Sequence, residues 1–487
     1  MELCKLTITE LSKMLREKKI SASELTADVY TQIEKVENDV KSYITLQKDE
    51  AMKKAAKIDE KFAANEDMPL LAGIPAGIKD NICTQGIKTT CASKILENFV
   101  PPYSATVMNR FEEQGVITVG KLNMDEFAMG SSCENSAFFK TKNPHDLERV
   151  PGGSSGGSAA SVAAFENIFS LGSDTGGSIR QPASYCGVAG LKPTYGAVSR
   201  YGLVAFASSL DQIGPLTRSI EDMAIVANTL YGHDSYDSTS LNYKFEDFTK
   251  DLDGNVKGVK IGLPKEYFSE GIDKDVKEQI LNAAKTYEKM GAELVEISLS
   301  LSDFALPTYY ILSSAEASSN LARFDGVKYG YRTENFTNLN ELYVKTRSEG
   351  FGDEVKRRIL LGTYVLSSGY YDAYYKKALQ ARKMIKNNFE EAFKKVDVIL
   401  TPATPETAFK MGEKTDDPLK MYMSDICTVA INIAGIPALV TPCGKDSKGL
   451  PIGMQLIGKE RQDGFLMKVA DAYDKNTGML KAMAAKL

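Results

Sequence analysis

Three observations predict an α/β fold for this 487-residue chain. Between about residues 70 and 230, short apolar runs alternate with segments rich in glycine, serine and proline, which is typical of buried strands that end in loops and helix starts. Segments with helical spacing precede and follow this region. With 43% hydrophobic and 25% charged residues, the composition matches an ordinary globular protein and disfavours a disordered chain, a collagen-like repeat or a coiled coil.

The N-terminal part of the chain, to about residue 65, is predicted to be a helical layer. Four apolar residues recur there at helical spacing, namely Leu25, Val29, Ile33 and Val36. Ser23 precedes the acidic Glu24 and is the expected N-cap. The first residues are charged, and no run reaches the roughly 18 apolar residues of a membrane span. We therefore expect a cytoplasmic protein with no membrane contact.

The second half of the chain is expected to resume the sheet and to insert helices. Residues 232–256 are polar and aperiodic, which predicts an exposed connection. GVKIGLP and AELVEISL predict strands on either side of a helix over about 273–291. Residues 300–395 are expected to be mostly helical, and VDVILTPATP, IPALVTPCG and LPIGMQLIGK predict returning strands before a C-terminal helix.

Charge, cysteine and histidine counts restrict the function. The 59 Lys and Arg against 64 Asp and Glu give a net charge of −5, which supplies no basic field for a nucleic-acid backbone. The seven cysteines form no C-x-x-C pair, as expected of reduced, buried thiols. With only two histidines, the chain has few residues of the type that usually binds transition metals or serves as the base of a Ser-His-Asp triad. We therefore predict no metal site, and we expect that a hydrolase of this sequence would use another base.

Two common motifs occur in incomplete form. Residues 115–121 match the start of a phosphate-binding loop, but Leu122 replaces the hydroxyl residue that would meet magnesium. We expect a strand-to-loop turn with a surface lysine at Lys121. Residues 152–156 fit G-x-S-x-G, yet an α/β-hydrolase needs a triad histidine late in the chain, and the last one is His233.

Two glycine-serine loops, PGGSSGGSAA at 151–160 and DTGGSIRQP at 174–182, carry the remaining chemistry. Successive glycines let backbone amides converge on one point, as in an oxyanion hole, and Ser178 directly follows two of them. Flexible linkers are the alternative, but both loops adjoin apolar segments. A serine nucleophile needs a base, and Lys79 would be neutral if buried. Otherwise Lys79 reaches solvent or pairs with Asp80.

Together, GIPAGIKDNI at 73–82 and these two loops resemble the amidase signature family. The resemblance implies a large twisted mixed β-sheet flanked by helices, in a single domain over residues 1–487 with a helical layer at about 1–65 and a helical insertion at about 300–395. It also implies a Ser-Ser-Lys triad. Ser178 would attack the amide carbon, Ser154 in a cis peptide would relay the proton, and Lys79 would be the base. The oxyanion would bind the amides of Thr175, Gly176 and Gly177.

Further segments, including GKLNMDEFAMGSS at 120–132 and YMSDICTVAINIAGIPAL at 422–439, resemble one subgroup, the glutaminase subunits of tRNA-dependent amidotransferases. The subgroup implies hydrolysis of glutamine within a heterotrimer that is completed by B and C subunits. One of these partners would hold the tRNA and use ATP and Mg with the released ammonia to convert Glu-tRNA(Gln) to Gln-tRNA(Gln), and this chain would need no cofactor. Tyr309 would line the glutamine pocket, with Arg358 on the carboxylate and Asp425 on the ammonium.

One departure and two alternatives accompany this resemblance. His145 stands where the family usually has tryptophan, and we assign it no catalytic role. A stand-alone amidase would keep the triad residues without needing Arg358 and Asp425. A non-enzymatic scaffold is disfavoured because all three triad residues are present.

Overall fold

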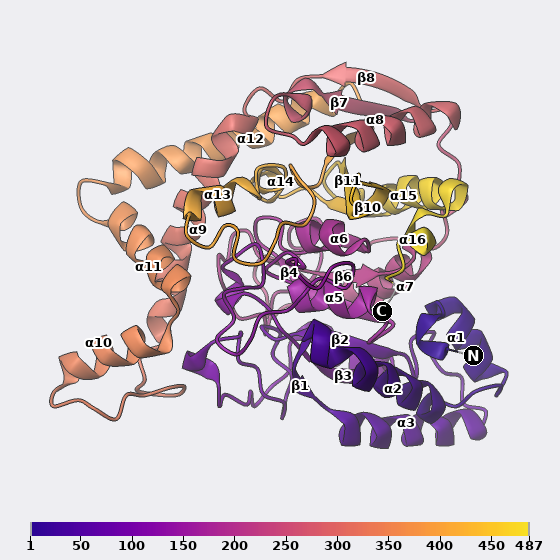
Figure 1. Ribbon diagram of the computed structural model, residues 1–487, viewed down its shortest axis with the longest axis horizontal. Coiled ribbons are helices and arrows are strands. Elements are labelled where there is room, and N and C mark those ends of the chain that lie inside the picture. Colours follow the sequence, from indigo (N-terminus) through magenta and orange to yellow (C-terminus); the bar gives the residue numbers. More distant parts are fainter. Residues whose placement is uncertain (1, 486–487) are drawn as a thin grey trace.

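A single sheet of eleven strands forms the centre of the molecule in a computed structural model that describes residues 2–485 (Figure 1). Strand β2 is parallel to β3 and β4, whereas β10 is antiparallel to β5 and β11, so the predicted mixed sheet is confirmed. In sheet order the strands are β1 (Tyr43–Leu46), β3 (Ile117–Leu122), β2 (Pro75–Lys79), β4 (Phe169–Asp174), β6 (Gln212–Thr217), β5 (Ala189–Lys192), β10 (Ala438–Lys445), β11 (Pro451–Gly458), β9 (Val398–Pro402), β7 (Lys260–Pro264) and β8 (Glu293–Ile297).

Helices flank this sheet along its whole length (Figure 1). Those outside the insertion are α1 (Ile8–Arg16), α2 (Ala22–Val40), α3 (Lys48–Ala63), α4 (Thr106–Glu113), α5 (Gly156–Ala163), α6 (Arg180–Cys186), α7 (Ile220–Leu230), α8 (Lys274–Lys289), α13 (Pro418–Met423), α14 (Val429–Ala434), α15 (Asp463–Thr477) and α16 (Met479–Ala482). Strands β7 to β11 and helices α8 and α15 occupy the segments in which the sequence predicts them.

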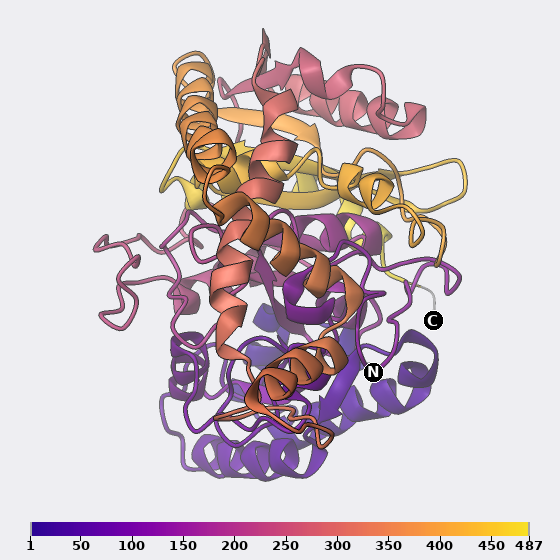
Figure 2. The same cartoon turned by 90° about the vertical axis from the view of Figure 1, so that its left-hand side faces the viewer.

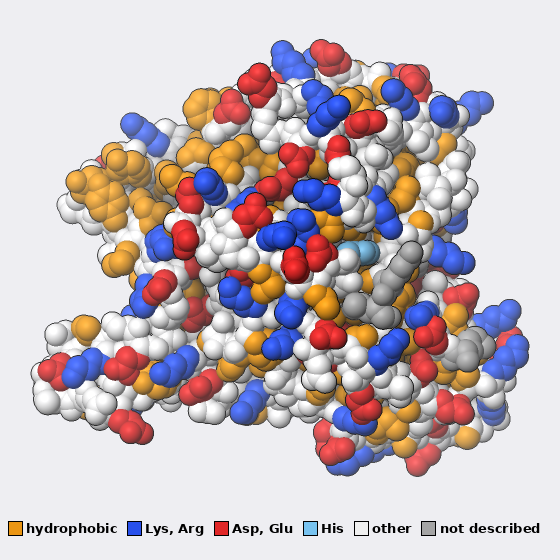
Figure 3. Space-filling view, viewed as in Figure 1, with side chains coloured by type: hydrophobic (Ala, Val, Ile, Leu, Met, Phe, Trp, Pro, Cys, Tyr) orange, Lys and Arg blue, Asp and Glu red, His pale blue; other side chains and the backbone are white. Residues whose placement is uncertain are grey.

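Helices α9 (Ala305–Asn320), α10 (Leu339–Gly350), α11 (Asp353–Leu366) and α12 (Lys376–Ala392) form an arm beside the sheet, which faces the viewer in Figure 2. Apolar side chains gather on the surface where α11 turns into α12 (Figure 3). Exposed residues there are Leu360, Tyr364, Tyr370, Tyr371 and Tyr374. Within the described residues, no helix has both the length and the apolar character to cross a membrane.

The N-terminal layer is helical except for strand β1, which the sequence does not predict because four residues between two helices carry little periodicity. The four apolar residues at helical spacing are buried in α2. The predicted cap was wrong. Ser21 caps α2 in a reciprocal capping box with Glu24, whereas the hydroxyl of Ser23 donates to Asp59.

Lys121 is not a surface lysine, contrary to the prediction. It lies on β3 between β1 and β2 and is fully buried. Its Nζ donates to the Ile82 carbonyl at 2.7 Å and the Thr89 hydroxyl at 2.8 Å, and it lies 3.7 Å from Asp80 Oδ1. Asp80 therefore pairs with Lys121 and not with Lys79.

The connection at 232–256 is irregular, as predicted, but it is not wholly exposed. Phe248 packs into the core against Tyr231, and Asp234 is buried, where it accepts hydrogen bonds from Ser199 and Thr106. All seven cysteines are free and buried, as the sequence predicts.

Candidate active site

The site forms where two neighbouring parallel strands end. Lys79 is the last residue of β2, and Ser173 is the second-last residue of β4. The two strands pair in parallel, with Ile78 opposite Leu171, so their carboxyl ends meet at one edge. The chain after β4 forms the loop 175–178 and then enters α6. This topology brings the predicted lysine and serines together from separate parts of the sequence.

Lys79 is fully buried among hydroxyl groups. Its Nζ lies 2.7 Å from the Ser154 hydroxyl, 2.8 Å from the Ser155 hydroxyl and 2.9 Å from the Ser173 hydroxyl. Burial lowers the pKa of Lys79 to about 7, because desolvation of the ammonium outweighs attraction by Asp125 and other nearby acidic groups. A substantial fraction of Lys79 is therefore a neutral amine at neutral pH and can accept a proton.

The two serines of the predicted triad differ in their access to solvent. Ser154 follows a cis peptide bond from Gly153 and is fully buried. Ser178 retains 8% of its surface, and its carbonyl accepts a hydrogen bond of 3.1 Å from the amide of Ser155. Ser178 is thus the more accessible of the two to a substrate, while Ser154 contacts the buried lysine directly.

Ser155 and Ser173 are site residues that the sequence does not single out. Besides bonding Lys79, Ser155 donates to the Ser173 carbonyl at 3.1 Å, and the side-chain amide of Asn81 donates to the Ser173 hydroxyl at 2.9 Å. These contacts fix the hydroxyl groups around the amine. Ser155 lies inside a recognisable loop, but nothing in the spacing of Ser173 distinguishes it from any other strand residue.

The loop after β4 is shaped by close contacts that only glycine permits. Gly177 has φ of +137°, and a Cβ there would clash with Thr428. A Cβ on Gly176 would lie 2.6 Å from the Tyr309 hydroxyl oxygen. Tyr309 therefore packs directly on the predicted oxyanion loop, and the Thr428 hydroxyl donates to the Gly176 carbonyl at 2.6 Å.

The three amides predicted for the oxyanion hole are not equivalent. The Gly177 amide donates to Asp174 Oδ1 at 2.9 Å and is therefore already engaged. Among the described residues, the amides of Thr175 and Gly176 have no acceptor, and neither has that of Ser178. Of the three predicted donors, Gly177 is therefore the one whose amide already has an acceptor among the described residues.

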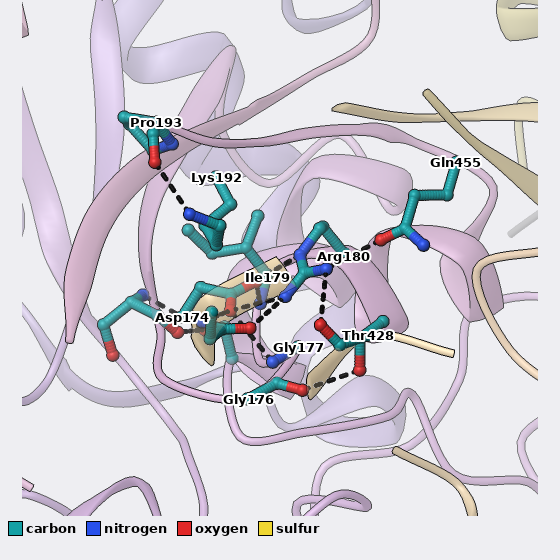
Figure 4. A network of polar contacts seen from close by, with 12 residues as sticks. Asp174, Gly176, Gly177, Ile179, Arg180, Lys192, Pro193, Thr428 and Gln455 are labelled. Carbon is teal, nitrogen blue, oxygen red and sulfur yellow. Dashed lines mark hydrogen bonds and ion pairs between the residues drawn. The ribbon is translucent and has the colours of Figure 1, made fainter. Parts of the chain in front are cut away.

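A buried ion pair between Asp174 and Arg180 lies next to this loop and contacts it (Figure 4). Arg180 Nε lies 3.0 Å from Asp174 Oδ2, and Arg180 Nη1 also donates to Gln455 at 2.7 Å and to the Thr428 carbonyl at 3.1 Å. Burial opposes ionisation of Asp174, but Arg180 outweighs it and keeps the pKa of Asp174 at about 2. Lys192 lies nearby and donates to the Pro193 carbonyl instead.

The residues predicted for glutamine binding also come together. Arg358 lies on α11, where its Nε donates to Glu354 at 2.6 Å, while its buried Nη1 has no hydrogen-bond partner among residues 2–485. Asp425 lies between α13 and α14 and is buried, which raises its pKa to about 6 despite hydrogen bonds from Ser131 and Tyr310. Tyr310 contacts both Asp425 and the Arg358 guanidinium, and a buried carboxylate near a guanidinium suits a ligand that carries both charges.

His145 lies outside this cluster. Its Nε2 is 3.0 Å from the Cys186 carbonyl at the end of α6, and its amide donates to Asn143 at 2.9 Å. Burial lowers the pKa of His145. Neither of these contacts involves Lys79, Ser154 or Ser178.

Known proteins resemble the chain over almost its whole length. The profile of the Amidase family matches residues 24–467. Two relatives, from Desulforamulus reducens and Heliobacterium modesticaldum, are each named as the A subunit of glutamyl-tRNA(Gln) amidotransferase. They are 57% and 58% identical, and each match covers 98% of both chains. The crystal structure of a protein of that name from Thermotoga maritima is 43% identical, with a TM-score of 0.82 over 98% of this chain and 96% of that one. The chain therefore belongs to the amidase family.

Proposed function

We propose that this chain is the glutaminase subunit of a tRNA-dependent amidotransferase. The observation that carries the proposal is the buried Lys79 amine, 2.7 Å from the Ser154 hydroxyl and beside the loop that bears the more accessible Ser178. A lysine with a pKa of about 7 supplies the base that the shortage of histidine otherwise leaves missing. The names of the relatives support the assignment to this class of subunit.

The proposed reaction begins when the Ser178 hydroxyl attacks the side-chain amide carbon of glutamine. Its proton passes to Ser154, whose own proton passes to neutral Lys79. The amides of Thr175 and Gly176 stabilise the oxyanion. The proton then returns through Ser154 to the leaving nitrogen, ammonia departs, and a glutamyl ester remains on Ser178. Water hydrolyses the ester by the same route and releases glutamate.

The α-amino and α-carboxylate groups of glutamine would bind next to this chemistry. Arg358 Nη1, which is buried and unpartnered within the described part of the chain, would donate to the carboxylate, and Asp425 would accept from the ammonium. Tyr309 would line the wall between these groups and the oxyanion loop, because its ring lies against Gly176.

The ammonia would serve a partner in a heterotrimer with B and C subunits. That partner would use ATP and Mg to convert Glu-tRNA(Gln) to Gln-tRNA(Gln), and it would hold most of the tRNA. The net charge of −5 is consistent with a chain that does not itself bind the tRNA backbone, which the partner subunit would bind instead.

Ammonia release by the purified chain tests this function. We expect weak hydrolysis of glutamine by the chain alone and faster hydrolysis after addition of the B and C subunits. A chain that ignores glutamine in both conditions and turns over simple aliphatic or aryl amides would instead be a stand-alone amidase.

Replacing Asp425 with asparagine should weaken glutamine binding. Because the substitution removes the negative charge but keeps the shape, KM should rise roughly 30-fold, which corresponds to about 2 kcal/mol. Steady-state kinetics of ammonia release measure the change. Asp416→Asn, the same substitution at an exposed position of the same segment, should leave KM unchanged. An unaltered KM in Asp425→Asn would remove Asp425 from the binding site.

Glutamine hydrolysis should be lost on acidification. Lys79 must be neutral to act as base and Asp425 must be ionised to bind the ammonium, so protonation of either group inactivates the site. With pKa values of about 7 and about 6, kcat/KM should fall about tenfold per unit as pH drops below 7, and more steeply below 6. A kcat/KM profile that stays flat between about pH 5.5 and 8 would contradict this assignment of the base.

A further inference from the structure

We propose that Tyr310 is a positioning residue that sets the specificity of this site for an α-amino acid amide. The inference rests on the proposed function and adds a residue to it. Tyr310 is 8% exposed and contacts each of the three residues expected to bind glutamine, namely Tyr309, Arg358 and Asp425.

The hydroxyl of Tyr310 orients the carboxylate. It donates to Asp425 Oδ2 at 2.9 Å, while the Ser131 hydroxyl lies 2.8 Å from Oδ1. Each oxygen of Asp425 therefore has a hydroxyl beside it, which limits rotation of the carboxylate and favours its ionised form against the effect of burial. Because a tyrosine ring is rigid, the position of Asp425 is fixed relative to α9.

The ring of Tyr310 holds the guanidinium. Arg358 Cζ lies 4.4 Å from the centroid of Tyr310 and 4.8 Å from that of Tyr422, and the two rings stack at 4.1 Å with an interplanar angle of 27°. Glu354 accepts hydrogen bonds from Arg358 Nε at 2.6 Å and from the Tyr422 hydroxyl at 2.8 Å. The guanidinium is thus held on several sides, and Nη1 is left for a ligand.

One side chain consequently fixes the distance between the two charges. The hydroxyl of Tyr310 contacts Asp425, which is expected to bind the α-ammonium. Its ring face contacts Arg358, which is expected to bind the α-carboxylate. The ring centroids of Tyr309 and Tyr310 lie 5.0 Å apart with an interplanar angle of 82°. Tyr309 itself packs against the predicted oxyanion loop at Gly176. An amide without α-amino and α-carboxylate groups could still pack against Tyr309, but its binding would not depend on the two charged groups that Tyr310 positions.

Tyr310→Phe tests this role because it removes the hydroxyl and keeps the ring. We expect KM for glutamine to rise about tenfold with kcat within about a factor of two, and hydrolysis of butyramide to stay at the wild-type rate. The acid limb of kcat/KM for glutamine should also move to higher pH, because Asp425 loses a donor that favours its ionised form.

A matched control separates specificity from stability. Tyr287→Phe removes another buried tyrosine hydroxyl, which donates to the Val469 carbonyl at 3.1 Å outside the site. Tyr287→Phe should change Tm about as much as Tyr310→Phe does, but its KM for glutamine should equal that of the wild type. Equal losses of glutamine and butyramide hydrolysis in Tyr310→Phe would indicate a merely structural role and overturn the proposal, as would an unchanged KM and acid limb. Failure of the wild-type complex to hydrolyse glutamine would instead contradict the proposed function itself.

Discussion

Replacing Ser178 with alanine should reduce glutamine-dependent ammonia release by roughly 10⁴-fold or more, because the variant has no hydroxyl to form the acyl-enzyme. The binding groups Arg358 and Asp425 remain in place, so glutamine should still bind. The assembled complex should also still amidate Glu-tRNA when free ammonia is supplied, since that step belongs to the partner. Ammonia release and tRNA amidation, measured on the same preparation, separate these half-reactions.

The control for this variant is another serine of the same segment. Ser184 lies on α6, where its hydroxyl accepts a hydrogen bond of 3.0 Å from the Gly453 amide of β11. Ser184→Ala should therefore retain glutaminase activity. Substantial glutamine hydrolysis by Ser178→Ala would show that another group is the nucleophile.

Replacing Lys79 with methionine should lower kcat for glutamine by roughly 10²- to 10⁴-fold, the usual contribution of a general base. Methionine fills a similar volume, but it leaves the hydroxyls of Ser154, Ser155 and Ser173 without the amine. Activity lost in this way should not return at high pH, because the variant has no base to deprotonate. Stopped-time assays of ammonia release from mildly acidic to alkaline pH measure the effect.

Lys192 provides a matched control for Lys79. Burial also lowers the pKa of Lys192 to about 7, but its amine donates to the Pro193 carbonyl and not to a serine. Lys192→Met should keep most of the activity, which would show that position beside Ser154 and not pKa alone defines the base. Normal kcat in Lys79→Met would remove Lys79 from the mechanism.

Much of this architecture follows from local sequence. Apolar runs and their glycine or proline ends predicted strands β7 to β11, and the two glycine-serine loops predicted where the serines lie. The sheet order is not readable in this way, because it depends on which distant strands pair. Strand β1 shows the same limit, since its four residues acquire their conformation by pairing with β3.

The site residues that lie in local sequence motifs could be predicted, whereas contacts between segments distant in the sequence could not. Lys79, Ser154 and Ser178 lie in recognisable loops. The engagement of the Gly177 amide by Asp174, by contrast, depends on a folded turn, and Tyr310 differs from Tyr309 only in the direction it faces. The burial of Lys121 was mispredicted because a lysine in a strand normally reaches water, and only the strands on either side prevent it.

The most direct test of the mechanism is to identify the labelled serine after reaction with a fluorophosphonate probe. Cleavage after Arg149 and Arg180 places Ser154 and Ser178 on one tryptic peptide, so fragment ions must assign the site. The mechanism predicts a label on Ser178 that forms in the wild type, is lost in Ser178→Ala and forms much more slowly in Lys79→Met. A label on Ser154, persisting in Ser178→Ala, would contradict the assignment of nucleophile and relay.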